Sequence, residues 1–346
     1  MTLDVVMTEK SPFDGRSLRE RPLGGAQAAF AYLAQALVSQ GHRVEAYTGT
    51  DRAHDDAGVA WRPLSQGTPV EADLYIASRA AELIGLVPRA RFRVFWLHNP
   101  AQHLKKPKFL MPLARWRPTL VVTGDYHAST VPWWAPRSRL VQIPHGTDPA
   151  FQRMAPRTTP PRPRAIVTSS PERGLEWLVH MWKERVQPRL PEAELHVFSG
   201  AQTYGGRKSE QLAAILDRAE KLAENATVSF HQPVPRDALV RELAEARVMA
   251  YRGDPGETFC MAAAEAQAMG VPVVTQPIGS LPERVEHGRS GFVEADPQAF
   301  AEACVRLLSD DALWQEHHQA ALESDRWSSW DTTAQRFAQL VDYRND

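Results

Sequence analysis

A chain of 346 residues is long enough for two domains, and 43% hydrophobic residues supply the material for two cores. The net charge of −1 gives no sign of a polyanionic partner for the whole chain. Residues 1–150 hold 18 Lys and Arg against 13 Asp and Glu, while the remainder holds 22 against 28. This asymmetry hints that the front half faces an anionic surface or substrate.

The two cysteines, Cys260 and Cys304, exclude a disulfide framework, and no Cys/His cluster indicates zinc. The apolar start, residues 1–6, is followed at once by Glu9 and Lys10, which is typical of a β-strand rather than a signal peptide. Since no run of 18 apolar residues occurs, we expect no membrane-spanning helix and a cytoplasmic protein.

The front half alternates apolar runs with one amphipathic segment. A helix is predicted over residues 26–40, and Gly41 is placed where a left-handed cap would end it. Short apolar runs predict buried strands over residues 3–7, 43–47, 74–77, 93–97, 120–123 and 140–143. Strands of this kind are typical of a parallel sheet covered on both faces.

Four prolines then crowd residues 156–163 and predict a stiff interdomain linker. The pattern restarts after it. Strands are predicted over residues 165–168, 194–198, 228–230, 248–251 and 271–274, and helices over 175–189, 211–223, 236–246, 259–269 and 300–308. The last stretch, residues 312–343, is predicted to be helical.

The expected fold is therefore α/β, with two doubly wound, Rossmann-like domains. The first is predicted to span residues 1–155 and the second residues 156–324, and a C-terminal helix at about 325–346 is expected to pack back on the first. Ligands of open α/β sheets bind at the carboxyl ends of strands, so we expect a cleft between the domains lined by loops that follow strands.

The segment 251–270 is the most informative part of the chain. It reads as strand, glycine-containing loop, helix and glycine stop, with Glu257 in the loop and Glu265 about two turns into the helix. Backbone amides near Thr258, Phe259 and Cys260 are predicted to be free donors at the positive end of that helix, which suits a diphosphate. Ionised carboxylates on both sides would accept hydrogen bonds from sugar hydroxyls.

This segment resembles the signature of the retaining glycosyltransferases of family four, which have the GT-B fold. Their signature is Glu, seven residues, Glu, which matches Glu257 and Glu265, and residues 271–293 continue the resemblance. The resemblance implies that Glu257 touches the donor sugar and Glu265 the ribose of the nucleotide. The family reads Glu-Gly-Phe-Gly at this point, whereas this chain has Thr258 and Cys260 in place of the glycines.

The family also places an Arg and a Lys for the diphosphate in the loop after the second domain's first strand. Arg173 matches the Lys, and Ser169 or Ser170 stands where the Arg is usual, so serine hydroxyls are expected to donate to phosphate. Arg252 is a second candidate for the missing positive charge. The alternative for Arg173 is a solvated loop residue beside a helix start.

Other donor contacts follow from the resemblance alone. Gly24 and Gly25 match a glycine-rich loop near the donor, although such a pair is otherwise only a turn. His98 matches a histidine beside the transferred sugar, with a packed structural histidine as the alternative. Nucleobase contacts fall near Gly200 and on the segment that contains Gln232 and Val234. Residues 145–148 match a family turn with His145 in place of Asn, and we interpret them as structural.

No Asp-x-Asp motif occurs, so the predicted site needs no metal and no cofactor besides the nucleotide sugar, with UDP assumed from family frequency. The expected reaction is transfer of a hexose-type sugar, with retention, to a hydroxyl of a glycan, lipid-linked or small-molecule acceptor. Glu257, His98 and Arg173 are the predicted catalytic residues. No nucleic acid is expected as a partner.

Residues 105–117 and 132–139 mix cations with large apolar side chains. Such segments suit an anionic membrane face or a lipid-linked acceptor, which would place the protein peripherally at the inner face of a membrane. A solvated basic face over an ordinary core and an oligosaccharide acceptor stay open as alternatives.

Two other functions remain open at this point. One is a GT-B nucleotide-sugar epimerase, which would need carboxylates in the first domain that the sequence does not clearly place. The other is a binding protein without catalysis, favoured by the changed glycines. A Rossmann oxidoreductase is disfavoured because no Gly-x-Gly-x-x-Gly follows the first strand.

Overall fold

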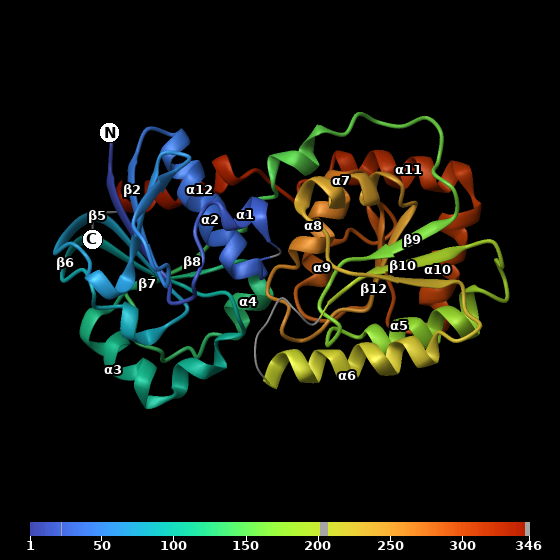
Figure 1. The fold of residues 1–346 in the computed structure, drawn as a ribbon, viewed down its shortest axis with the longest axis horizontal. Helices are drawn as coiled ribbons and strands as arrows, with labels where there is room; N and C mark the ends of the chain where they lie inside the picture. Colours follow the sequence, from blue (N-terminus) through green and yellow to red (C-terminus); the bar gives the residue numbers. More distant parts are fainter. Residues whose placement is uncertain (22, 201–206, 343–346) are drawn as a thin grey trace. The chain divides into compact units, whose positions relative to one another are not determined.

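The computed structural model describes residues 1–21, 23–200 and 207–342 (Figure 1). The chain forms two compact units, Met1–Gly146 with Ser328–Asp346, and Thr147–Trp327. The sequence analysis placed these boundaries at 155/156 and near 325. The proline-rich stretch 156–163 lies within the second unit, where Arg157 N donates to His318 Nε2 (2.9 Å).

The first unit is built on one eight-stranded sheet in the order β3-β4-β2-β1-β5-β6-β7-β8. All neighbours are parallel except β3 and β4. The strands are β1 (Asp4–Thr8), β2 (Arg43–Thr48), β3 (His54–Asp56), β4 (Val59–Pro63), β5 (Glu71–Ser78), β6 (Arg89–Trp96), β7 (Thr119–Val122) and β8 (Leu140–Gln142).

The hairpin β3-β4 was not predicted from the sequence. Its turn is formed by Ala57 and Gly58, both with positive φ (49° and 77°), which is the geometry of a tight two-residue hairpin. The polar residues of β3 carry no apolar periodicity that would predict a strand. At this edge the sheet therefore has two more strands, β3 and β4, than the sequence predicts.

The helices of the first unit are α1 (Ser17–Glu20), α2 (Gly25–Ser39), α3 (Pro107–Trp116), α4 (Asp125–Ser129) and α12 (Trp330–Gln339), with short 3-10 turns η1 (Leu64–Gln66), η2 (Ala81–Leu83), η3 (Ala101–Lys105) and η6 (Leu340–Asp342). Gly41 has φ +83° just after α2, as the predicted helix stop requires. The helix α3 was not predicted, because Pro112 lies inside it.

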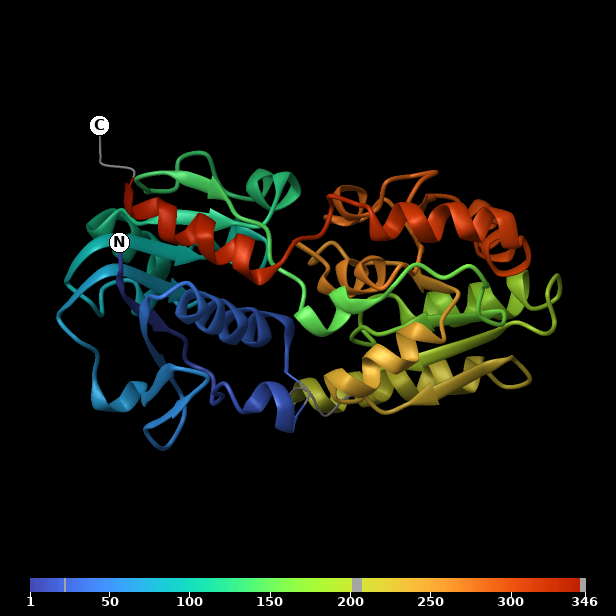
Figure 2. The same ribbon diagram turned by 90° about the horizontal axis from the view of Figure 1, so that it is seen from above.

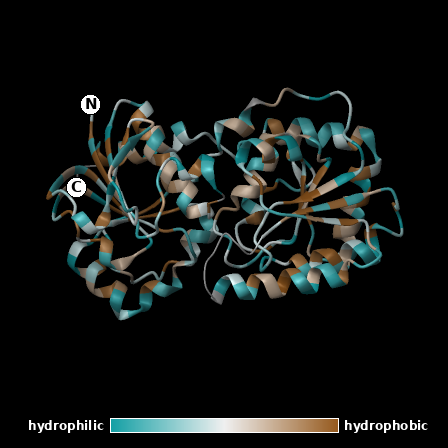
Figure 3. Ribbon diagram, viewed as in Figure 1, coloured by the Kyte–Doolittle hydropathy of each residue, from teal (hydrophilic) through white to brown (hydrophobic). Residues whose placement is uncertain are grey.

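The second unit holds a six-stranded, all-parallel sheet in the order β11-β10-β9-β12-β13-β14. Its strands are β9 (Arg164–Val167), β10 (Glu194–Phe198), β11 (Val228–His231), β12 (Val248–Tyr251), β13 (Val273–Thr275) and β14 (Gly291–Val293), the last of which was not predicted. All residues of β9, β12 and β13 are buried, as parallel strands covered on both faces require. Hydrophobic residues gather along these central strands (Figure 3).

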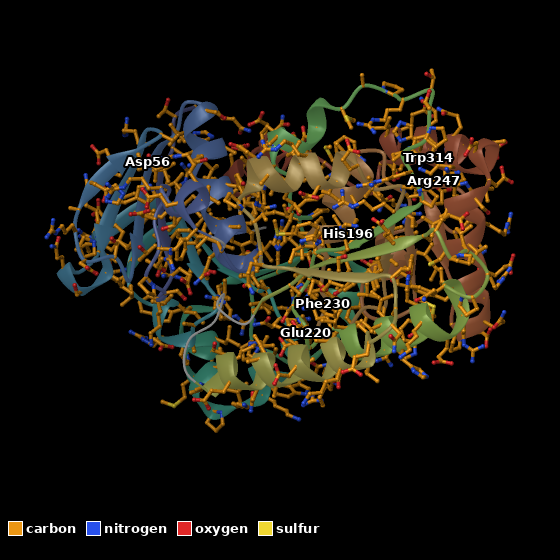
Figure 4. All side chains as sticks on the ribbon, turned by 45° about the vertical axis from the view of Figure 1, so that its right-hand side comes forward. Asp56, His196, Glu220, Phe230, Arg247 and Trp314 are labelled. Atoms are coloured by element: carbon orange, nitrogen blue, oxygen red, sulfur yellow. The ribbon has the colours of Figure 1, made fainter. Side chains whose placement is uncertain are left out.

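Helices cover both faces of this sheet: in Figure 1, α5 and α6 lie on one side, and α7, α8 and α11 on the other. The elements are η4 (Pro149–Arg153), α5 (Leu175–Met181), the π-turn η5 (Trp182–Val186), α6 (Arg207–Leu222), α7 (Arg236–Ala244), α8 (Met261–Ala268), α9 (Leu281–Arg284), α10 (Pro297–Ser309) and α11 (Asp311–Leu322). The indole Nε1–H of Trp314 anchors α11 by donating to Arg247 O (2.9 Å; Figure 4).

The predicted helix over residues 312–343 is interrupted. It breaks after Leu322 and restarts as α12, where the Ser329 hydroxyl caps the new helix by accepting from Thr332 N (3.2 Å). Figure 2 shows α12 alongside α2, and the rings of Tyr32 and Trp330 stack with centroids 5.8 Å apart. The end of this prediction, residues 343–346, lies outside the described residues.

Candidate functional site

The strand order of the second unit places its site. Chain connections reverse direction between β9 and β12, which are neighbours in the sheet. At such a switch point the loops after the two strands diverge and leave room for a ligand. The loop after β9 carries Arg173 and the loop after β12 carries Glu257, so the fold brings these two predicted residues together.

Glu257 is the centre of this arrangement. Its side chain is only 8% exposed and forms an ion pair with Arg173. The Tyr251 hydroxyl donates to Glu257 Oε1 (2.6 Å). Burial raises the pKa of Tyr251 well above its ordinary value, so the phenol keeps its proton and remains a donor. Glu257 is thus held by two donors from β12 and from the loop after β9.

The helix that follows begins later than predicted. α8 starts at Met261, not at Phe259, because Cys260 has a left-handed backbone (φ +62°) that a helix cannot include. The first helical amides are therefore those of Met261 and Ala262, and Thr258 and Phe259 lie in the preceding loop. Phe259 is buried beneath the Arg284 guanidinium, 4.5 Å from the ring centroid. The sequence analysis placed the donors at the helix end near Thr258, Phe259 and Cys260, and the structure moves them to Met261 and Ala262.

Glu265 lies inside α8 and is 4% exposed. Arg236, the first residue of α7, forms an ion pair with its Oε1. Burial raises the pKa of Glu265, Arg236 opposes that rise, and Asp148 adds to it. The Arg236 guanidinium also lies 5.5 Å from the centre of the Phe151 ring. Both signature carboxylates are thus buried, and each is paired with an arginine.

The serines of the loop after β9 have different surroundings. The Ser170 hydroxyl is buried and has no hydrogen-bond partner within residues 1–21, 23–200 and 207–342. Ser169 is a hydrogen-bond partner of Tyr251, and its carbonyl accepts from the Ser199 hydroxyl (2.7 Å). A buried hydroxyl without a partner is costly, and donation by Ser170 to phosphate stays a prediction.

Arg252 points elsewhere. Its guanidinium lies 5.4 Å from the centre of the Trp177 ring, and its Nε–H donates to Gln276 Oε1 (3.1 Å). Glu257 is paired with Arg173 instead.

The predicted base-contact residues lie at the ends of β10 and β11. A Cβ on Gly200 would come within 2.5 Å of Pro233 Cδ, so the glycine permits this close approach. The Gln232 side chain is exposed, whereas Val234 packs against the core of the second unit. Gly200, Gln232 and Val234 therefore lie together at the carboxyl ends of β10 and β11, although the Val234 side chain packs against the core.

The remaining predicted residues belong to the first unit. His98 follows β6 and is buried, with Nε2 3.3 Å from the Ser78 hydroxyl and its ring stacked on that of His145 (5.3 Å). Burial lowers the pKa of His98 well below its ordinary value, so the ring is neutral. Gly24 caps α2 and donates its N–H to Gln27 Oε1 (3.2 Å), and Gly25 is the exposed first residue of that helix.

The sequence analysis did not single out two arginines, Arg236 and Arg79, that pair with buried carboxylates. One pair is Arg236 with Glu265. The other is Glu9, which follows β1 and is 3% exposed, with Arg79, which follows the neighbouring strand β5. The available signal was position, because Glu9 and Arg79 each come two residues after the end of a predicted strand.

The described parts of the chain show neither a metal-binding cluster nor a membrane-spanning helix. These parts contain no group of three or more His, Cys, Asp or Glu side chains that could hold a metal ion. None of their helices has the length and apolar run needed to span a bilayer.

The fold and site define a protein of the GT-B class: two doubly wound α/β units, with signature carboxylates at the switch point of the second. Solved structures share this fold over nearly all of the chain, and two examples follow. Sucrose-phosphate synthase from Thermosynechococcus elongatus covers 98% of both chains at 17% identity with a TM-score of 0.73. Anabaena Alr3699/HepE, in complex with UDP and glucose, covers 99% of this chain and 100% of its own at 15% identity, also with a TM-score of 0.73.

Residues 164–310 match the family of glycosyl transferases group 1. The chain is 36% identical over 137 residues to a D-inositol 3-phosphate glycosyltransferase of Corynebacterium urealyticum, over 39% of this chain and 32% of the relative. A Nocardioides relative of the same name is 37% identical over 128 residues, 36% of this chain and 28% of its own. The matched part spans about a third of the relatives' length. The predicted resemblance to family four and the GT-B fold are confirmed.

Proposed function

We propose that this protein is a retaining glycosyltransferase. It would transfer a hexose-type sugar from a UDP-sugar donor to a hydroxyl of a glycan, glycolipid or small-molecule acceptor. The group 1 domain over residues 164–310 supports sugar transfer, and the UDP and glucose bound by HepE support the donor. The observation that carries the proposal is the pair of buried carboxylates, Glu257 and Glu265, that flank the start of α8.

Each group at this site has a proposed part in holding the donor. Glu265 would accept hydrogen bonds from the ribose hydroxyls, and Glu257 from the sugar. The diphosphate would be met by Arg173, by the Ser170 hydroxyl and by the first amides of α8. Binding would then draw Arg173 from Glu257 toward phosphate oxygens, which leaves Glu257 free to accept from hydroxyls.

The chemistry requires stabilisation of a leaving diphosphate while positive charge grows at the anomeric carbon. Arg173 and the amides at the start of α8 would stabilise that diphosphate without a metal. A departing phosphate oxygen would serve as the base for an acceptor that attacks from the same face, so no second carboxylate acts as nucleophile. The contact of His98 with the sugar stays a prediction.

The first experiment measures thermal stabilisation of the full chain by a panel of nucleoside diphosphates, because a ligand of the folded state raises its stability. We expect UDP to give the largest shift. Glu265→Ala should weaken UDP binding by about 10- to 100-fold, the loss typical of charged hydrogen bonds. Glu316→Ala, at an exposed position of α11, is the control and should bind normally.

A turnover assay then separates the three candidate functions. With UDP-glucose and a mixture of acceptors, transfer supports the proposal, whereas isomerisation of the donor or binding without turnover overturns it. We expect Glu257→Ala to lower turnover far more than UDP affinity. Full activity in both Glu257→Ala and Glu265→Ala would refute the site.

The epimerase alternative requires a carboxylate base in the first unit. Among that unit's described residues, Glu9 is the acidic side chain that is buried. It is held by Arg79 and accepts from Ser11 N (2.7 Å), so it is engaged as an acceptor already. This arrangement favours transfer over epimerisation.

A further inference from the structure

The strongest charge imbalance of the chain lies between residues 83 and 147. This stretch contains a single acidic residue, Asp125. It contains ten basic residues: Arg89, Arg91, Arg93, Lys105, Lys106, Lys108, Arg115, Arg117, Arg137 and Arg139. The stretch therefore carries a large positive charge in a protein whose net charge is −1.

The helix α3 displays part of this charge on an amphipathic surface at the lower margin of the first unit in Figure 1. Phe109 and Leu113 are buried in the core of the first unit. Met111 points outward and is 75% exposed. Lys108 and Arg115 stand three residues before and four after it, so both lie on the same exposed face as this apolar side chain.

A second element of the same surface is the loop 132–139. Trp133 is 86% exposed and Trp134 is 45% exposed. Hydrogen bonds within the loop stabilise its conformation. Arg137 Nη1 donates to the carbonyl oxygens of Trp133 (3.2 Å) and Ala135 (2.8 Å). The exposed tryptophans are thus held outward by a defined turn.

Hydrogen bonds join this loop to the end of α3. Arg117 Nη2 donates to Arg137 O (3.2 Å), and Ser138 N donates to Pro118 O (3.1 Å). Residues 105–117 and 132–139 together are therefore treated as one surface, called the basic–aromatic face.

Five exposed cations of this face lack the ion pairs that some other cations of the first unit form. Elsewhere in that unit, Lys10, Arg19 and Arg43 each form an ion pair with a carboxylate. On the face, five exposed cations have no ion pair within the described part of the chain: Lys105, Lys106, Lys108, Arg115 and Arg117. Their charge is left for an anion outside the chain.

We propose that the basic–aromatic face docks on the surface of an anionic lipid bilayer. Unpaired cations are attracted to anionic headgroups, while Trp133, Trp134 and Met111 would enter the interfacial region, where amphipathic aromatic rings are favoured. A soluble polyanion would satisfy the cations but would leave these apolar side chains in water. The combination of both features is what favours a bilayer.

The test measures co-sedimentation of the full chain with vesicles of phosphatidylglycerol and phosphatidylcholine, and with vesicles of phosphatidylcholine alone. We expect binding to the anionic vesicles that weakens as NaCl is raised. The triple variant Lys105→Glu, Lys106→Glu, Lys108→Glu should bind at least about 100-fold more weakly, since each cation near the surface contributes about fivefold. Trp133→Ala with Trp134→Ala should also weaken vesicle binding.

The matched control reverses three exposed cations outside the face, Arg52→Glu, Lys221→Glu and Arg336→Glu, which changes the net charge equally. It should bind anionic vesicles nearly as the unchanged protein does. The proposal is overturned if control and face variants lose binding alike. It is also overturned if the tryptophan variant binds vesicles fully, which would indicate a site for a soluble polyanion. Melting curves verify that each variant is folded, and no step depends on transferase activity.

Discussion

Cys260 occupies a backbone conformation that side chains with a Cβ rarely adopt. Its φ of +62° and ψ of +76° place it in the left-handed region, directly before α8. This conformation costs roughly 1–2 kcal/mol for a residue other than glycine. The family that this segment resembles has glycine at this position, and glycine adopts such a conformation without strain.

The stabilities of two Cys260 variants should therefore follow a predictable order. Cys260→Gly should be more stable than Cys260→Ala by about 1 kcal/mol, because only glycine adopts this φ without strain. At Cys304, buried inside α10, the order should reverse by about 1 kcal/mol, since glycine weakens a helix interior. Urea unfolding of the four variants measures both differences. If the Gly and Ala variants had the same order of stability at both cysteines, the backbone of Cys260 would not be strained.

His127 shows how burial sets a protonation state in the first unit. Thr123 N donates to its Nδ1 (3.2 Å), and its Nε2 lies 3.0 Å from Asn99 O, so the ring is neutral with the proton on Nε2. Burial lowers the pKa of His127 from 6.5 to about 4. Protonation thus favours the unfolded chain.

The stability that neutral His127 confers should disappear in acid. It is complete above pH 6.5, the unfolded pKa, and is lost as the pH falls toward the folded pKa of about 4. The loss amounts to about 3 kcal/mol. His127→Gln cannot titrate, so the difference in unfolding free energy between it and the unchanged protein should shrink across this range. Parallel pH profiles of the two proteins would show that burial does not shift this histidine.

At the scale of elements, two loops of the second unit interlock around Glu257. Ser280, just before α9, donates its N–H to Glu257 O (3.0 Å). A Cβ on Gly279 would lie 2.7 Å from Glu257 O and 2.9 Å from Asp254 O. The loop before α9 therefore supports the loop before α8, and only glycine permits the approach.

Gly279→Ala should displace Glu257 and weaken UDP binding by roughly tenfold, in addition to its cost in stability. Gly288→Ala is the control, because Gly288 also has a positive φ (+78°) but has nothing within 4 Å of its added Cβ. That variant should lose only about 1 kcal/mol of stability from strain and should keep its UDP affinity. Calorimetric titration with UDP separates the two effects. Equal UDP affinity in both variants would show that the interlock is irrelevant to binding.

At the scale of the whole molecule, the first unit is discontinuous in sequence. Its core is completed by the C-terminal segment, in which Trp330 is 3% exposed and stacks on Tyr32 and on His145. A Cβ on Gly146 would collide with the Trp330 backbone. The chain thus leaves the first unit after residue 146 and returns to it at 328.

Trp330→Ala should therefore destabilise the first unit by about 3–5 kcal/mol, the usual cost of removing a buried tryptophan. Trp133→Ala removes an equally large side chain that is 86% exposed, and should change the unfolding free energy by less than about 0.5 kcal/mol. Urea unfolding of the full chain measures the effect, and limited proteolysis shows whether cleavage within residues 1–146 becomes faster. Similar losses in both variants would mean that the C-terminal segment does not complete this core.

The sequence by itself determined the doubly wound class of both units and the position of Glu257 and Glu265. Both depend on local information: apolar runs predict buried strands, and a motif with a fixed spacing folds into one loop and helix. Missed elements had weak local signals, as the polar strand β3 and the proline-containing helix α3 show.

Only the tertiary structure decided which groups meet. Arg236 reaches Glu265 from another helix, Arg173 reaches Glu257 across neighbouring strands, and Arg79 reaches Glu9 from strand β5 to strand β1. These contacts join residues that are tens of positions apart. Local periodicity records whether a side chain is buried, but the partner of a buried charge depends on how the strands are ordered in the sheet.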